Sequence, residues 1–264
     1  MPKLTTAAEA RAVATPMRVV IVTMDNHLAS ATQRAAVRLA REVPGLVLTM
    51  HTAAEWANDD AALKRCHDDI ARGDLIINTM LFVEEHFNAV LPALQARRDH
   101  CDAMIGCMSA TEIAKLTRIG RFNMDGKQEA SGAMALLKRL KPKPKEGGAA
   151  KTTAGAEQMK MLRRLPKLLR FIPGTAQDVR AYFLTLQYWL AGSEDNIVNM
   201  VRFLVDRYAE GPRRGLRGTA KVASPVEYPE VGVYHPRMKG RLAAEANGLP
   251  GAPGPSGNPR GTVG

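Results

Sequence analysis

The run Met17-Arg-Val-Val-Ile-Val-Thr-Met24 decides the fold class of this chain of 264 residues. It is apolar almost throughout and has the length of one strand, which is typical of a strand buried on both faces of a parallel sheet. Three more runs of strand length follow, separated by segments with the apolar spacing of helices; these runs are 46–50, 74–80 and 103–108. The alternation predicts an α/β fold, a doubly wound parallel sheet with right-handed crossovers and a flavodoxin-like topology.

The helices between these strands have recognisable ends. Asn58 and Asp59 can cap one of them, because their side chains accept hydrogen bonds from the free amide groups of a first helical turn. Ser109 or Thr111 is expected to cap a short helix that runs through Arg118. The alternation of strand and helix stops after residue 121.

Two further helices are predicted in the second half of the chain. Thr175 should cap the first, which Gly192 closes, and Ser193 should cap the second, which runs through Tyr208. Apolar residues recur at helical spacing in both, so the helices should pair as an antiparallel hairpin. The side chains expected at their contact are Leu184, Leu186, Trp189 and Leu190 against Ile197, Val201 and Leu204.

The composition along the chain predicts five segments. They are a flexible N-terminus (1–16), an α/β domain (17–121), a helix with a basic linker (122–157), a helical region (158–210) and coil that leads toward a further domain (211–264). Within them, Pro142 to Ala156 and Gly248 to Pro259 are rich in glycine, proline and polar residues and have little to bury. We expect both of these stretches to be mobile.

Positive charge is concentrated in one stretch. The chain has a formal net charge of +11, and residues 138–170 hold eleven Lys or Arg residues against only Glu146 and Glu157. Because the remainder is close to neutral, the chain is not predicted to bind nucleic acid. The stretch is either an interaction segment for a protein partner or an anionic surface, including peripheral membrane contact, or a solvated helix face beside a linker.

Cysteine usage and hydropathy limit the cellular setting. Cys66, Cys101 and Cys107 contain no CxxC pair, which argues against a disulfide framework and a zinc site. No run reaches the roughly 18 apolar residues of a membrane span, and the first residues lack the apolar core of a secretory signal. We therefore predict a cytoplasmic protein without a transmembrane segment.

Two polar triplets follow predicted strands, where doubly wound sheets gather their ligands. Asp25, Asn26 and His27 come after the first strand; they either face a ligand or form a polar loop before a helix. Glu84-Glu85-His86 comes after the third strand. Its carboxylates and imidazole could hold a metal or move protons, or the acidic residues could simply complement the dipole of a helix N-terminus.

Nucleotide-binding motifs are missing from the chain. No GxGxxG follows the first strand and no GxxxxGK[ST] occurs, so dinucleotide and P-loop binding have no motif support. No Ser-His-Asp arrangement is persuasive either. No residue is therefore assigned a catalytic role, and no metal ligand is assigned.

Four stretches resemble the large, H-type porphyrin-binding subunit of magnesium chelatase, which is related to the large cobaltochelatase subunit. They are RVVIVTMDNHLASA (18–31), GDLIINTMLFVEEH (73–86), IPGTAQDVRAYFLTLQYWLAGSEDNIVNMVRFLVDRYA (172–209) and VYHPRM (233–238). The last two are the most specific. The resemblance covers most of 17–242 and corresponds to the N-terminal portion of that protein only.

The resemblance implies a role in metal insertion into a porphyrin. A complete protein of this type binds protoporphyrin IX and works with two smaller subunits, one of them an AAA+ ATPase. Together they use ATP to insert magnesium during chlorophyll or bacteriochlorophyll biosynthesis. The groups usually implicated in insertion lie beyond the matched region, so the resemblance implies that this chain binds neither magnesium nor ATP and is inactive alone. The alternative is a non-catalytic basic interaction module built on 138–170.

Overall fold

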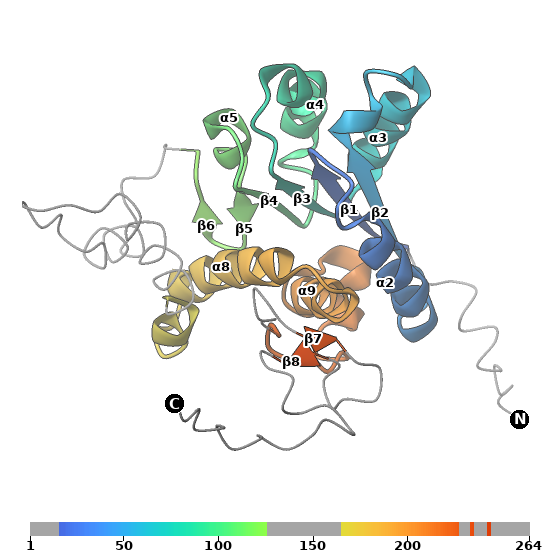
Figure 1. Cartoon of the computed structure of the whole chain (residues 1–264). Helices are drawn as coiled ribbons and strands as arrows, with labels where there is room; N and C mark the ends of the chain where they lie inside the picture. The colour runs from blue at the N-terminus through green and yellow to red at the C-terminus, as the bar shows by residue number, and fades with distance from the viewer. Residues whose placement is uncertain (1–15, 126–164, 227–232, 235–241, 244–264) are drawn as a thin grey trace, which may run out of the picture. The chain divides into compact units, whose positions relative to one another are not determined.

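Four apolar runs of the sequence form the parallel strands of one sheet. In the computed structural model, which describes residues 16–125, 165–226, 233–234 and 242–243, these strands are β1 (Met17–Thr23), β2 (Leu46–Thr52), β3 (Leu75–Thr79) and β4 (Ala103–Cys107). They are parallel and lie in the order β2-β1-β3-β4 (Figure 1). This order confirms the predicted doubly wound sheet and matches the flavodoxin-like arrangement over these four strands.

The chain departs from the prediction after β4. Helix α5 (Thr111–Ala114) is a single turn, and Arg118 belongs instead to β5 (Arg118–Ile119), which is antiparallel to β4 and pairs with β6 (Phe122–Asn123). The hydroxyl of Thr117 explains the reversal, because it accepts from the Gly106 N–H at 2.9 Å and donates to the Gly106 carbonyl at 3.2 Å. The segment after α5 is thereby held against β4.

Neither predicted cap of the short helix is correct. The residue at its N-terminus is Ala110, without a side-chain cap, and Thr111 is the first helical residue. The Ser109 hydroxyl is used elsewhere: it accepts from the Leu81 N–H at 3.1 Å and donates to the Cys107 carbonyl at 3.1 Å. It therefore joins the loops that follow β3 and β4.

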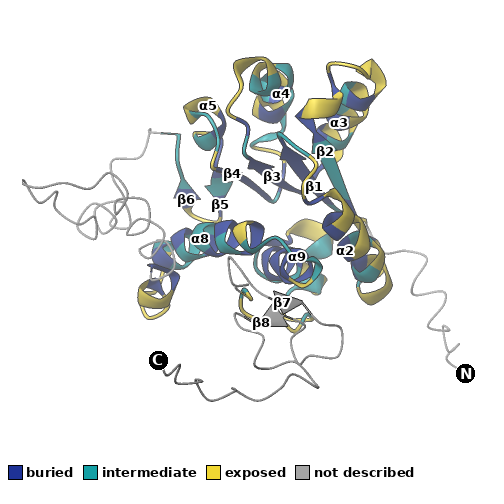
Figure 2. Ribbon diagram, viewed as in Figure 1, coloured by how far each residue is buried: buried dark blue, intermediate teal, exposed yellow. Residues whose placement is uncertain are grey.

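Helices cover both faces of the sheet. One face carries α2 (Ala29–Glu42), α8 (Thr175–Ala191) and α9 (Glu194–Tyr208), and the other carries α3 (Asp60–Arg72), α4 (Glu84–Arg97) and α5 (Figures 1 and 2). Alternate residues of β1 enter the two cores: Val19 and Ile21 belong to the core that α2, α8 and α9 cover, whereas Val20 and Val22 belong to the core that α3, α4 and α5 cover. Strands β1, β3 and β4 are thus buried on both sides, as their continuous apolar runs predict. The expectation is wrong for β2, where Val47 is 40% exposed because the strand lies at the edge of the sheet.

The helix ends test the predicted caps. The Asp59 carboxylate caps α3 by accepting from the Ala62 N–H at 3.1 Å, and the Ser193 hydroxyl caps α9 by accepting from the Asn196 N–H at 3.2 Å, so both predictions are confirmed. Gly192 ends α8 in the left-handed region, at φ 59°. The cap assigned to Thr175 is wrong, because the N-terminal residue outside α8 is Gly174 and no side chain caps that end.

Helices α8 and α9 pack together as predicted, with one exception. Leu184, Leu186 and Trp189 are buried in the same core as Ile197, Val201 and Leu204. Leu190 is 41% exposed and does not belong to that core. The exposure follows from the helical period, since Leu190 lies next to Trp189 and therefore points about 100° away from it.

The described residues up to Pro225 form one compact unit, which includes the 3-10 turns η1 (Ala53–Glu55) and η2 (Gly211–Leu216). A second unit begins at Val226 and contains a short antiparallel pair, β7 (Val233–Tyr234) and β8 (Leu242–Ala243). The prediction of coil throughout 211–264 is therefore too simple. The predicted helix and linker beyond residue 125, the start of the basic stretch, and both stretches expected to be mobile lie outside the described residues.

Hydropathy of the helices gives one further result. Among the described helices, none combines the length and the apolar character that crossing a membrane requires.

Candidate functional site at the carboxyl ends of the strands

The two predicted polar triplets flank the point where the sheet changes winding direction. The chain leaves β1 toward α2 on one face and leaves β3 toward α4 on the other, although β1 and β3 are neighbours. Thr23 and Thr79, the last residues of these strands, are register partners. Loops that part between adjacent parallel strands leave a crevice at their carboxyl ends, which is the usual ligand position in open α/β sheets.

The first triplet forms a compact turn after β1. The Asp25 carboxylate accepts a hydrogen bond from the His27 N–H at 3.1 Å and a short one from the His27 imidazole Nδ1. The carbonyl of Asn26 accepts from the Ala29 N–H at 2.9 Å at the start of α2. The hydrogen bond from the His27 side chain lowers the pKa of Asp25. The side chains of His27 and Asp25 stay 46% and 39% exposed, so this pair is accessible to a ligand.

The second triplet begins α4. Glu84 and Glu85 occupy the first turn, are exposed and complement the helix dipole, which is the simpler of the two roles considered for them. His86 differs, because it is partly buried and its ring lies edge-on to Trp56, with centroids 6.4 Å apart. Its Nδ1 is buried without a hydrogen-bond partner among the described residues. A buried polar nitrogen without a protein partner usually bonds an ordered water molecule or has a functional role.

The structure does not join the two triplets into one cluster. His27 lies edge-on to Trp189 of α8, with ring centroids 5.9 Å apart, whereas His86 contacts Trp56 beyond the end of β2. These tryptophans belong to the cores on opposite faces of the sheet. Across residues 16–125 and 165–226, no three His, Cys, Asp or Glu side chains converge closely enough to hold a metal ion. The candidate site therefore consists of two separate imidazoles, one after β1 and one after β3.

A row of threonine hydroxyls at this edge was missed by the sequence analysis. Thr23, Thr52 and Thr79 end β1, β2 and β3, and they are register partners across the sheet. The hydroxyls of Thr23 and Thr52 are buried without a hydrogen-bond partner in the described part of the chain, as is the indole N–H of Trp189. The Thr79 hydroxyl lies near the buried Cys107 thiol. The sequence analysis ended these strands at Met24, Met50 and Met80, so the threonine row became apparent only from the observed strand ends.

An exposed apolar lip borders the same edge. Phe82, Val83 and Met108 are 53%, 42% and 37% exposed. The loops that carry them are tied by the Ala110 N–H, which donates to the Leu81 carbonyl at 2.8 Å. Residues Met80 and Met108 follow β3 and β4 with φ of 59° and 47°, a left-handed conformation that costs on the order of 1–3 kcal/mol outside glycine. The fold therefore holds this lip in a defined but strained shape.

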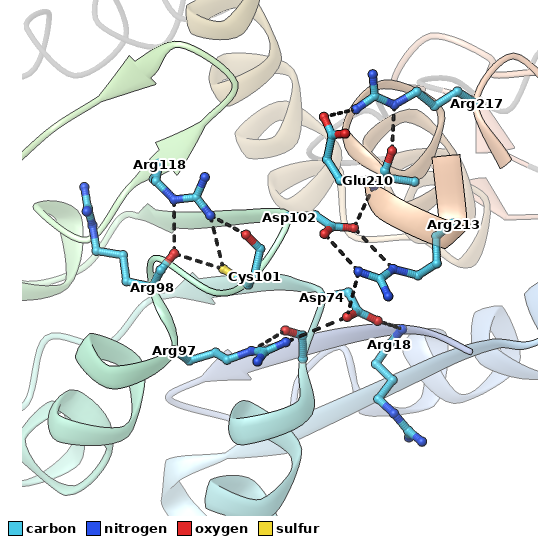
Figure 3. Close-up of polar contacts among 12 residues, drawn as sticks. Arg18, Asp74, Arg97, Arg98, Cys101, Asp102, Arg118, Glu210, Arg213 and Arg217 are labelled. Carbon is cyan, nitrogen blue, oxygen red and sulfur yellow. Dashed lines mark hydrogen bonds and ion pairs between the residues drawn. The ribbon is translucent and has the colours of Figure 1, made fainter. Parts of the chain in front are cut away.

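The opposite end of the sheet is occupied by a buried ionic clamp (Figure 3). Arg213 of η2 lies between two carboxylates, at 3.2 Å from Asp74 Oδ1 and 3.0 Å from Asp102 Oδ1. Asp74 also accepts from the Arg18 N–H at 2.8 Å and lies 3.8 Å from Arg97. Burial raises the pKa of Asp74. The clamp fastens the segment after α9 to the amino ends of β3 and β4 and leaves the carboxyl ends free.

Comparison with known proteins gives the family. Residues 18–183 match a family model described as "Domain of unknown function (DUF3479)", and residues 186–254 match one described as "CobN/Magnesium Chelatase". The chain is 49% identical over 232 residues to the magnesium-chelatase H subunit of Cereibacter sphaeroides, across 88% of its own length. The chain belongs to the magnesium-chelatase H-subunit family. The resemblance inferred from its sequence motifs is thereby confirmed.

Other members of the H-subunit family are more distant. Identity is 45% over 232 residues to the H subunit of Rhodobacter capsulatus, and 32% over 184 residues to the chloroplastic ChlH protein of Oryza sativa subsp. indica. The chain spans 19% of the length of the two bacterial relatives and 12% of the plant one. It therefore corresponds to one part of the H subunit. The boundary between the two family models falls inside α8, a single helix that belongs wholly to the first structural unit.

Proposed function

We propose that this chain is the part of a magnesium-chelatase H subunit that helps to bind protoporphyrin IX for magnesium insertion in chlorophyll or bacteriochlorophyll biosynthesis. The observation that carries the proposal is the exposed apolar lip of Phe82, Val83 and Met108, in the loops that follow β3 and β4 at the carboxyl end of the sheet. A flat apolar macrocycle binds chiefly by burying its faces against apolar side chains, with a few polar groups to orient it.

The complete complex has more parts than this chain. In the proposed function the two smaller chelatase subunits, one an AAA+ ATPase, drive the ligase reaction with ATP, and magnesium is its substrate. The groups present here support a binding role: His27 offers an exposed imidazole, and Thr23 and Thr79 end the two adjacent strands that lead into the triplets. Deprotonation of two pyrrole nitrogens needs positioned bases, and the separation of the two triplets argues that insertion uses groups from elsewhere in the complete protein. A cytoplasmic location is part of the same proposal.

The binding role is tested by titrating the chain with protoporphyrin IX and following tryptophan fluorescence. Trp56 and Trp189 lie beside the two imidazoles, so bound porphyrin should quench them. A Phe82→Ser, Met108→Ser double variant should bind about tenfold more weakly or worse, because each buried apolar side chain contributes roughly 1.5–3 kcal/mol.

The matched control is Val37→Ser, which removes an apolar side chain that is 51% exposed on α2. It should bind porphyrin like the parent chain. If the control and the lip variant weaken binding equally, or if the lip variant binds unchanged, the lip is not the porphyrin site.

A second candidate function is docking through the basic stretch, and one described feature favours it. Phe171 is 83% exposed beside Lys167 and Arg170. Its turn is held by the Gln177 side-chain amide, which donates to the carbonyls of residues 169, 170 and 172 at 2.6–3.2 Å. Sedimentation with vesicles of phosphatidylglycerol tests this function. Phe171→Ser should reduce the bound fraction, and equal binding to phosphatidylcholine vesicles would count against an anionic surface as the ligand.

A further inference from the structure

Strand β2 is an open edge of the sheet. Its only neighbour among the described strands is β1. The seven residues Leu46–Thr52 contain no lysine, arginine, acidic residue, proline or glycine. Soluble proteins usually protect an edge strand with such residues, with a bulge or with a covering segment, because a bare edge pairs readily with another strand. The described part of this chain has none of these devices along β2.

The hydrogen bonds between β1 and β2 show which backbone groups of β2 face the open edge. The Met17 N–H of β1 donates to the Gly45 carbonyl at 2.9 Å. Since successive residues of a strand direct their backbone groups to opposite sides, odd-numbered residues of β2 face β1. The amide and carbonyl groups of Leu48 and Met50 therefore point to the open edge and are available to an added strand.

A hollow of about 530 Å³ lies along the same edge, between β2, η1 and α3. Its wall on β2 runs from Thr49 to Thr52, and Trp56 also lines it. The His51 imidazole borders it at 2.9 Å from the Asp69 carboxylate. Strand addition uses backbone hydrogen bonds for affinity and a neighbouring pocket for the side chains that give specificity. Both components are present at this edge.

The charges around the hollow select the side chain that it takes. Arg65 and Arg72 already pair with Asp59 and Asp69, at 3.0 Å and 3.2 Å. Glu55 and Asp68 also line the hollow, and both are exposed. In the described part of the molecule their carboxylates have no ion-pair or hydrogen-bond partner. The uncompensated charge is therefore negative, which suits a lysine or arginine side chain.

We propose that β2 is a docking edge for an extended basic segment of a partner polypeptide. The segment adds as a strand beside β2 and pairs with the backbone groups of Leu48 and Met50. One of its lysine or arginine side chains enters the hollow and meets Glu55 and Asp68. The hollow shares Thr52 and Trp56 with the candidate site but contains none of the residues of the apolar lip, so the inference does not depend on porphyrin binding at the lip.

The test titrates the full chain with the peptide acetyl-Thr-Val-Thr-Lys-Thr-Val-Thr-amide and follows backbone amide resonances. Saturable shifts should centre on Leu48 and Met50. The same peptide with N-methyl groups on alternate residues should not bind, because it lacks the donors of the new strand. A peptide with glutamate at its centre should bind about fivefold more weakly or worse, the effect of losing an exposed ion pair of up to ~1 kcal/mol.

Variants of the chain distinguish binding through the hollow from backbone pairing along the edge. In Glu55→Gln, Asp68→Asn the preference for lysine over glutamate should disappear while shifts at Leu48 and Met50 persist. Glu112→Gln, which removes an exposed carboxylate on α5, should keep the preference. The proposal is overturned if the lysine peptide shows no binding up to about 1 mM, or if the N-methylated peptide binds equally. It is also overturned if the chain alone sediments as a dimer with the Leu48 and Met50 amides protected, because the occupant is then a second copy.

Discussion

The two imidazoles at the carboxyl ends of the strands are held by different neighbours, and this sets what each can do. His27 shares a hydrogen bond with Asp25 and is half exposed, whereas the Nδ1 of His86 is buried and unpartnered within the described residues. Sequence position predicted that both would follow strands. It could not predict their separate surroundings, because Trp189 and Trp56 reach them from distant parts of the chain.

The contact between His27 and Asp25 has a measurable electrostatic effect. His27→Ala should raise the pKa of Asp25 toward its ordinary value, since the largest cause of the present lowering is the hydrogen bond from His27. A depressed carboxyl pKa contributes stability above the unfolded-state pKa, and this contribution is lost as the pH falls through the folded-state pKa. Carboxyl carbon resonances followed through the acid range would measure the shift.

The control for this measurement is His86→Ala. It should leave the titration of Asp25 unchanged, because the two triplets do not touch. A shift of the Asp25 titration in that variant would mean that the triplets are coupled in solution.

Arg213 is a residue whose role the sequence could not reveal, since it is 111 positions from Asp102 along the chain. Arg213→Ala should lower the free energy of unfolding by about 3–5 kcal/mol, because it leaves two buried carboxylates without their shared cation. Asp74 and Asp102 have side chains only 8% and 7% exposed. Urea unfolding followed by circular dichroism would give the change.

Arg214→Ala is the matched control for the clamp. Arg214 also lies in η2 but is exposed, so its loss should change stability by no more than about 0.5 kcal/mol. Equal losses in the two variants would show that the ionic clamp is not the cause.

Among the elements, the long helices and buried strands were predictable because the spacing of apolar residues in each is that of a helix or a strand over many residues. The two-residue strands β5 and β6 were not, because a period cannot be read from two residues and the turn depends on the contact between Thr117 and Gly106. The threonine row could not be predicted, because the apolar runs of the sequence placed the strand ends at Met24, Met50 and Met80. Each strand instead ends in threonine, and the register of β1, β2 and β3 places the three hydroxyls side by side.

The contact between α8 and α9 gives a prediction at this level of structure. Leu204 is fully buried in their shared core, so Leu204→Ala should cost about 2–5 kcal/mol through lost burial and the cavity left behind. Thermal unfolding of the two proteins would measure it. Leu190→Ala, at the 41% exposed position of α8, should unfold close to the parent temperature. An unchanged melting temperature for Leu204→Ala would contradict the helix pairing.

In the molecule as a whole, the two ends of the sheet carry different groups of residues. The amino ends of β3 and β4 are closed by the clamp of Asp74, Asp102 and Arg213, and the carboxyl ends carry the apolar lip and the imidazoles. Sequence motifs alone gave the family, because they run almost unbroken through 172–209. They could not give the lip, since exposure depends on which loops the fold brings together.

The last prediction concerns magnesium insertion by the chain itself. With the two partner subunits, ATP, magnesium and protoporphyrin IX supplied, we expect no magnesium protoporphyrin from this chain. Insertion requires bases within hydrogen-bond reach of two pyrrole nitrogens, whereas His27 and His86 lie against different tryptophans and Glu84 and Glu85 are exposed at a helix start. An absorbance assay for magnesium protoporphyrin measures the product, with a complete H-type protein as the positive control. Steady product formation that disappears in a Glu85→Ala, His86→Ala variant would contradict the prediction and make that triplet the insertion site.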